Sequence, residues 1–170
     1  EIMEKKHNYL DAFQTNKAVS TSTINSLVSY TNVSKTFNSN LQIGSSGNLQ
    51  LKSGANVTIN GDLVILGNVS VYSGATLSVN GDIYVSGGIS VNGGKLVVNR
   101  AASGGIPGGN IYAYYDEDAA VEHPSIGFHG GANVTISKVT DSNGFFIFDN
   151  ATLGMSGTTT KLTVNGLFVA

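Results

Sequence analysis

The densest cluster of side chains that could do chemistry is a short acidic run in the second half of the chain. It consists of Asp116, Glu117, Asp118, Glu122 and His123. Carboxylate oxygens at alternate positions are ligands that Ca²⁺ accepts, but the run lacks the ligand spacing and the glycine of a dedicated calcium loop. We therefore interpret it as a solvated loop rather than a metal site, and we expect no metal and no cofactor.

Three tyrosines precede the acidic run. Tyr112 and Tyr114 are two residues apart, so on a strand they share a face, while Tyr115 points the other way. Rings with polar tips suit a carbohydrate platform, and they suit equally well a cap of packed rings over a core. Because recognition usually sits on loops that interrupt a rigid scaffold, the three tyrosines with Asp116 and Asp118 are the predicted contact surface for a cellulose-like glycan or a partner subunit.

The remaining residues offer little for catalysis. Polysaccharide lyases and hydrolases need clustered carboxylates beside basic groups. The only charged residues between positions 38 and 99 are Lys52, Asp62, Asp82 and Lys95. None of the three histidines has a recognisable serine or aspartate constellation around it. We therefore expect no catalytic residues.

The composition narrows the class of protein further. The chain has 170 residues, 41% of them hydrophobic, which is enough for the core of a single domain. Its net charge of −2 and the lack of a basic patch argue against nucleic acid as a partner. Cysteine is absent, so disulfides and zinc–thiolate sites are excluded. No stretch has the length of a transmembrane helix. We expect a processed or excised piece of a longer protein, whose membrane anchor would lie upstream.

Internal repeats decide the predicted fold. The segment LQLKSGANVTIN (49–60) aligns with VSVYSGATLSVN (69–80) and, with one residue deleted, with ISVNGGKLVVN (89–99). Apolar and polar residues alternate within each copy, so one face points inward. A fixed period of about 20 residues with glycine and asparagine corners is typical of a solenoid. An antiparallel sandwich is the alternative, but it does not explain copies that return in register.

The fold class is therefore predicted as all-β, a parallel β-solenoid of about six rungs with about 20 residues per rung, preceded by an N-terminal α-helical segment. The helical prediction covers residues 1–37, where apolar residues fall at roughly helical spacing. Residues 38–170 form the predicted solenoid, with an inserted loop at about 100–128. Asp62 and Asp82 occupy the same corner of successive repeats, where we expect them to hydrogen-bond the turn backbone rather than hold a cation.

The segments NGDLVILGNVS (60–70) and NGDIYVS (80–86) resemble the repeats of bactofilin-type polymer-forming β-solenoids. A helical N-terminus before such a ladder is similar to PilX-type surface proteins associated with bacterial type IV pili. The tāpirins, cellulose-binding surface proteins linked to pilus loci, have the same broad architecture. The resemblance covers about residues 40–99 and 129–170. It implies display at the cell surface, with a polysaccharide or a pilus or envelope subunit as partner, and it carries over no functional residue.

We therefore expect a non-enzymatic, extracytoplasmic structural or adhesive module, part of a pilus-linked or cell-surface protein that attaches to polysaccharide. Two alternatives stay open. One is a self-assembling, bactofilin-like scaffold, and the other is a fragment of a solenoid enzyme that acts on polysaccharide.

Overall fold

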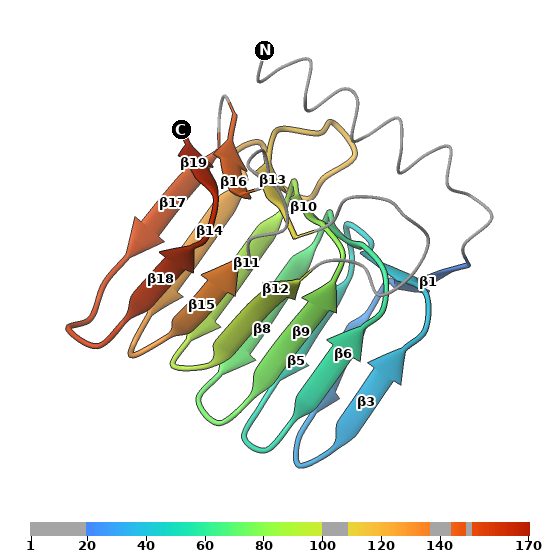
Figure 1. Ribbon diagram of the computed structural model, residues 1–170. Helices are drawn as coiled ribbons and strands as arrows, with labels where there is room; N and C mark the ends of the chain where they lie inside the picture. The colour runs from blue at the N-terminus through green and yellow to red at the C-terminus, as the bar shows by residue number, and fades with distance from the viewer. Residues whose placement is uncertain (1–19, 100–108, 137–143, 149–150) are drawn as a thin grey trace.

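The computed structural model describes residues 20–99, 109–136, 144–148 and 151–170, and these ranges contain strands and no helix. The strands form three parallel sheets that run side by side along one axis (Figure 1). Sheet A contains β1 (Thr21–Ile24), β4 (Asn40–Ile43), β7 (Leu63–Ile65), β10 (Ile83–Val85), β13 (Ile111–Ala113), β16 (Gly144–Ile147) and β19 (Leu167–Val169). Sheet B contains β2 (Leu27–Tyr30), β5 (Asn48–Leu51), β8 (Asn68–Tyr72), β11 (Gly88–Asn92), β14 (Ser125–His129) and β17 (Thr152–Met155). Sheet C contains β3 (Ser34–Phe37), β6 (Asn56–Ile59), β9 (Thr76–Asn80), β12 (Lys95–Asn99), β15 (Asn133–Ile136) and β18 (Lys161–Val164).

One rung is a turn of the chain that adds one strand to each sheet. Strands of successive rungs pair in parallel, as for β7 with β10 and for β8 with β11. In the regular part the step between paired positions is 20 residues, for example from Asn60 to Asn80. The predicted parallel β-solenoid is therefore confirmed. The repeats dictate this fold because each strand can bury its apolar face only with the strands of its neighbouring rungs.

The interior of the solenoid is filled by alternate residues of every strand. Leu63 and Ile83 stack in sheet A, Val69 and Ile89 in sheet B, and all four are buried. Aliphatic side chains fill the middle rungs, whereas Phe128 and Phe145 meet edge to face in the later rungs, with ring centroids 6.4 Å apart. The residues between these inward positions face out, so they decide what each sheet shows to its surroundings.

From β7 to β16 the outer face of sheet A is apolar. Val64, Tyr84, Tyr112 and Phe146 follow one another on neighbouring strands and all are buried. The ring of Tyr112 stacks on Tyr84 at 5.4 Å and on Phe146 at 5.3 Å. This cluster is separate from the interior core. The polar outer faces of the solenoid are therefore those of sheets B and C.

The corner between sheets B and C requires a left-handed backbone. Gly54 and Gly74 have φ near +80° at equivalent corners, a conformation that is strained for residues with a Cβ. The first rung uses Asn32 there, with φ of 53°, and asparagine tolerates this region better than most residues. The Ser-Gly-Ala corners of the sequence repeats thus have a direct conformational cause.

Two parts of the predicted domain organisation differ from the structure. Residues 21–37 are three strands and form the first rung, so the helical prediction is wrong for them. Their β-branched and aromatic residues (Thr, Ile, Val, Tyr and Phe) favour strands, although their apolar spacing suggested a helix. Residues 1–19 lie outside the described residues.

The predicted insertion also overlaps regular structure, because β13 and the first part of β14 belong to the fifth rung. The described loop between these strands covers residues 114–124, and Ala120 N donates to Leu66 O at 2.9 Å.

The corner between sheets C and A holds two ladders of polar side chains. In one, Asn80 Nδ2 donates to Asn60 Oδ1, and Asn60 Nδ2 donates to Asn38 Oδ1. In the other, Asp82 N donates to Asp62 Oδ1 at 2.8 Å, and Asn110 donates to Asp82 Oδ1 from both its backbone and its amide. Side-chain bonding to the turn backbone, as predicted for both aspartates, is confirmed.

Asp82 is a buried carboxyl in this ladder, and we expect it to make stability depend on pH. Burial, followed by the nearby charge of Asp62, raises the pKa of Asp82 well above its ordinary value of 3.8, and burial also raises the pKa of Asp62. A carboxyl with a raised pKa in the folded state contributes its stability fully below the ordinary pKa, and this contribution is lost as pH rises through the folded-state value. The solenoid should therefore be more stable in mild acid than at neutral pH.

We expect Asp82→Asn to raise the melting temperature at pH 7 and to flatten its rise on acidification. An asparagine keeps the accepting oxygen for Asn110, as the asparagine at position 40 does for Asp62 N, and it removes the charge. Thermal unfolding followed by circular dichroism between pH 4 and pH 8 measures both effects. Asp118→Asn, the same change on an exposed loop, serves as the control. A lower melting temperature for Asp82→Asn at pH 7 would contradict the expectation.

Candidate functional site

The predicted tyrosine surface is mostly inside the molecule. Tyr112 and Tyr114 are 1% and 5% exposed, and burial raises the pKa of Tyr114 to about 12. The alternative of packed rings therefore describes Tyr112 and Tyr114, because both belong to the apolar cluster on sheet A. Only Tyr115, 44% exposed, shows its ring to solvent. The structure does not bring the three tyrosines together on one accessible face.

The acidic residues of the predicted site lie on the loop that follows β13. Asp116 Oδ1 accepts a hydrogen bond from Asp118 N at 2.8 Å, which is a local turn contact. Among the residues that the structure describes, no three His, Cys, Asp or Glu side chains are placed to share a metal ion. In the structure the Asp116 carboxylate organises this loop, and Asp118 is exposed.

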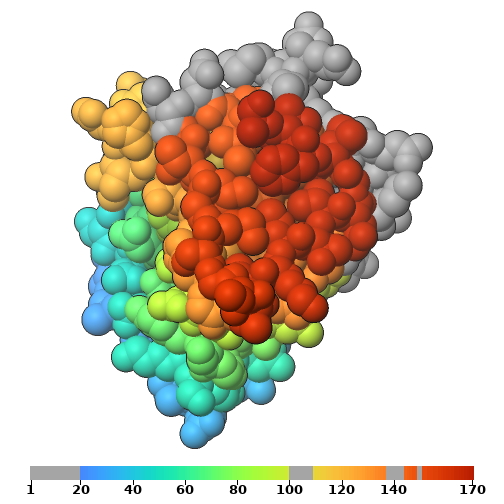
Figure 2. All heavy atoms as spheres, turned by 90° about the vertical axis from the view of Figure 1, so that its left-hand side faces the viewer, coloured from blue at the N-terminus to red at the C-terminus, as the bar shows by residue number. Residues whose placement is uncertain are grey.

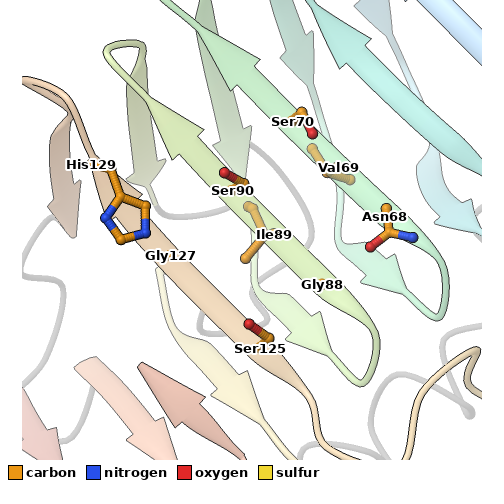
Figure 3. A pocket seen from close by; sticks show the side chains of 9 residues that line it. All are labelled: Asn68, Val69, Ser70, Gly88, Ile89, Ser90, Ser125, Gly127 and His129. Atoms are coloured by element: carbon orange, nitrogen blue, oxygen red, sulfur yellow. The ribbon is translucent and has the colours of Figure 1, made fainter. Parts of the chain in front are cut away.

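A concave polar site occurs elsewhere, on the outer face of sheet B (Figure 3). It is a shallow hollow of about 240 Å³ across β8, β11 and β14. The residues that line it are Asn68, Val69, Ser70, Gly88, Ile89, Ser90, Ser125, Gly127 and His129. Hydroxyl, amide and imidazole groups make up its polar lining, and no lining residue is Asp, Glu, Lys or Arg. We refer to this site as the sheet B hollow.

Two glycines create the floor of the sheet B hollow. Gly88 and Gly127 occupy outward positions where other strands carry side chains. A Cβ at Gly88 would lie 2.7 Å from Asn68 Oδ1, and a Cβ at Gly127 would lie 2.8 Å from His129 Nε2. The Asn68 amide and the His129 ring thus lie against glycine backbone. Their positions depend on the absence of side chains at these two residues.

The imidazole ring of His129 is positioned by a hydrogen bond at Nδ1, the ring nitrogen that does not face Gly127. Its Nδ1 lies 2.7 Å from Ser156 Oγ, in the loop after β17, and Ser156 O accepts a hydrogen bond from Thr160 Oγ1. A serine beside a histidine is also the start of a nucleophilic centre, but such a centre needs a group that orients the base. No carboxylate of the described residues hydrogen-bonds this ring. The pair therefore positions the imidazole at the edge of the hollow.

Neither the His129–Ser156 pair nor the sheet B hollow was predicted from the sequence, and each has an identifiable reason. His129 and Ser156 are 27 residues apart, and they meet only because β14 and β17 are neighbours in sheet B. The hollow had a signal in the repeats, since Gly88 stands at the position that Asn68 occupies one rung earlier. A glycine in place of an outward polar residue marks a missing side chain on an otherwise covered face.

The fold and this site define a class of protein, a parallel β-solenoid with an apolar patch on one outer face and polar side chains on the other two. No protein family, curated protein or solved structure matches the chain. Within the described residues, no helix is long and apolar enough to cross a membrane.

Proposed function

We propose that this chain is a non-enzymatic structural and adhesive module of a cell-surface protein, linked to a type IV pilus or to the cell envelope, that attaches to polysaccharide. The observation that carries the proposal is the array of neutral polar side chains on the outer face of sheet B. Its central row consists of Ser29, Gln50, Ser70 and Ser90, which are successive partners in the ladder. Such an array, fixed at the spacing of the strands, offers hydroxyl and amide groups to a polymer that is itself rich in hydroxyls.

An enzymatic function has weaker support than an adhesive one. Glycoside hydrolysis commonly needs two carboxyl groups on either side of the scissile bond. Asp62 and Asp82 are near each other, but both accept hydrogen bonds from the backbone of the next rung, and Asp82 is buried. These aspartates hydrogen-bond the turn backbone at the corner between sheets C and A rather than lining an accessible site.

A second candidate function is a scaffold that assembles end to end. β17, β18 and β19 each pair with a strand on one side only among the described residues. At this end Met155, Leu167 and Phe168 are exposed, and Figure 2 shows the last rung from that side. An open strand edge can pair with another chain, and head-to-tail contacts that do not close give filaments.

Adsorption to insoluble polysaccharide tests the proposed function. We expect the purified chain to be depleted from solution by microcrystalline cellulose, in a saturable manner and without release of soluble sugar. Binding should survive added salt, because the array carries few charges. Absence of adsorption, together with filaments in electron micrographs, would overturn the proposal in favour of the scaffold. Release of sugar by the purified chain would favour an enzyme.

A further inference from the structure

We propose that the sheet B hollow is the contact site itself, and that it binds one or two sugar units of a neutral glycan chain. This inference rests on the proposed function and deepens it, because it assigns the glycan to one of the two polar faces. Three features carry it: the shape of the hollow, the types of polar groups around it and an exposed ring beside it.

The shape fits a small part of a long polymer. A volume of about 240 Å³ is below the roughly 300–1,000 Å³ of sites that enclose a whole small molecule. The hollow extends over three neighbouring strands, which span roughly 10 Å along the solenoid axis. An extended chain can lie in such an open trough and continue beyond it at both ends.

The polar groups fit hydroxyls rather than ions. Ser70, Ser90 and Ser125 supply hydroxyls that donate and accept, and Asn68 supplies an amide with both capacities. Sugar hydroxyls have the same double capacity. An anion such as a phosphate would find no Lys or Arg in the lining. A metal ion would find no carboxylate there.

An exposed aromatic ring adjoins the hollow. Tyr72 lies two residues after Ser70 on the same face of β8 and is 37% exposed. In the ladder it pairs with Asn92, which pairs in turn with His129. A tyrosine in this position offers an apolar surface for the faces of sugar rings, together with a polar tip. Tyr72 takes the role that the sequence predicts for Tyr112.

The outer face of sheet C lacks this combination. The outward positions that correspond to Gly88 and Gly127 on sheet C carry Lys95 and Thr135. The central outward residue of β9 is Ser78, which is half-buried, as Ser90 is on β11. Sheet C therefore lacks the floor, and Ser78 on it supplies a matched control for Ser90.

The test compares Ser90→Arg with Ser78→Arg in adsorption isotherms on microcrystalline cellulose. An arginine at position 90 places a long side chain in the centre of the hollow, and the change at position 78 adds the same charge and bulk to sheet C. We expect Ser90→Arg to weaken binding at least tenfold and Ser78→Arg to change it less than twofold. Circular dichroism melting shows whether both variants are folded. Should Ser90→Arg not fold, the double variant Asn68→Ala/His129→Ala, which only removes side-chain atoms, replaces it with the same expected loss.

The outcomes separate the two proposals. If the parent chain adsorbs to cellulose and Ser90→Arg adsorbs equally well, the contact site lies elsewhere and this inference is wrong, while the proposed function stands. The inference is also wrong if Ser78→Arg causes the larger loss, because sheet C would then be the contact face. If the parent chain does not adsorb at all, the proposed function fails first.

Discussion

Substitution of Gly87 by alanine is expected to lower the free energy of unfolding by about 3 kcal/mol, at the upper end of what overpacking usually costs. Gly87 lies at the corner between sheets A and B, where successive rungs touch through their backbones. A Cβ at this residue would overlap the backbone oxygens of Gly67 and Leu66 in the previous rung. Backbone atoms cannot turn away as a side chain can, so the two rungs would have to separate there.

The matched control for this prediction is Gly154→Ala. Gly154 lies on the outer face of β17, and a Cβ built there meets no atom within 4 Å. We expect its effect to remain within about 0.5 kcal/mol, as is usual for surface substitutions. Chemical denaturation followed by circular dichroism gives both values. Equal stabilities for the two variants would mean that the rungs are not in close backbone contact at Gly87.

Substitution of Tyr112 by alanine is expected to cost about 3–5 kcal/mol, the range found when a buried aromatic side chain is removed. The ring lies between Tyr84 and Phe146 and is 1% exposed, so its loss leaves a cavity in the middle of the aromatic stack. The measurement is the denaturation midpoint of the variant. Tyr115→Ala, three residues further along and 44% exposed, is the control and should change the midpoint little.

Comparison of Tyr112→Ala with Tyr115→Ala also decides between two interpretations of residues 112–115. If Tyr112 served an exposed binding surface, its removal would leave stability unchanged and lower adsorption to cellulose. We expect instead that Tyr112→Ala lowers the stability of the protein and that Tyr115→Ala does not. A stable, folded Tyr112→Ala protein would show that the stack on the outer face of sheet A contributes little.

The sequence was sufficient for the regular part of the fold, because its repeats carry the same information several times. Val57, Leu77 and Leu96 recur at matching positions, and the structure places them in one interior row. Residues 21–37 carry no such repeated information. Their apolar residues fit a helical spacing, but pairing with the second rung is a tertiary effect that a local pattern does not contain.

The burial of Tyr112, which the sequence did not reveal, has a related reason. Tyrosines that depart from the repeat suggested a loop, yet Ile111 and Ala113 continue the inward row of sheet A and turn Tyr112 onto the face shared with Tyr84. The position of Tyr112 on β13 therefore determines which residues its ring contacts. The sheet B hollow depends on side chains from the third, fourth and fifth rungs, and the pairing of His129 with Ser156 joins the fifth rung to the sixth. Neither can be read from residues that are close in sequence.

The constant register between the middle rungs has a consequence for how such a chain can change in length. Asn48, Asn68 and Gly88 are successive partners at the same level of sheet B, and their neighbours keep the same order on all three sheets. In-frame gain or loss of one whole repeat would therefore rejoin equivalent corners and leave every remaining strand with a partner of the right length. Insertions of other lengths can be accommodated at a corner, as residues 114–124 are. In genetic terms, the repeat is the unit by which the gene can be lengthened or shortened without loss of the fold.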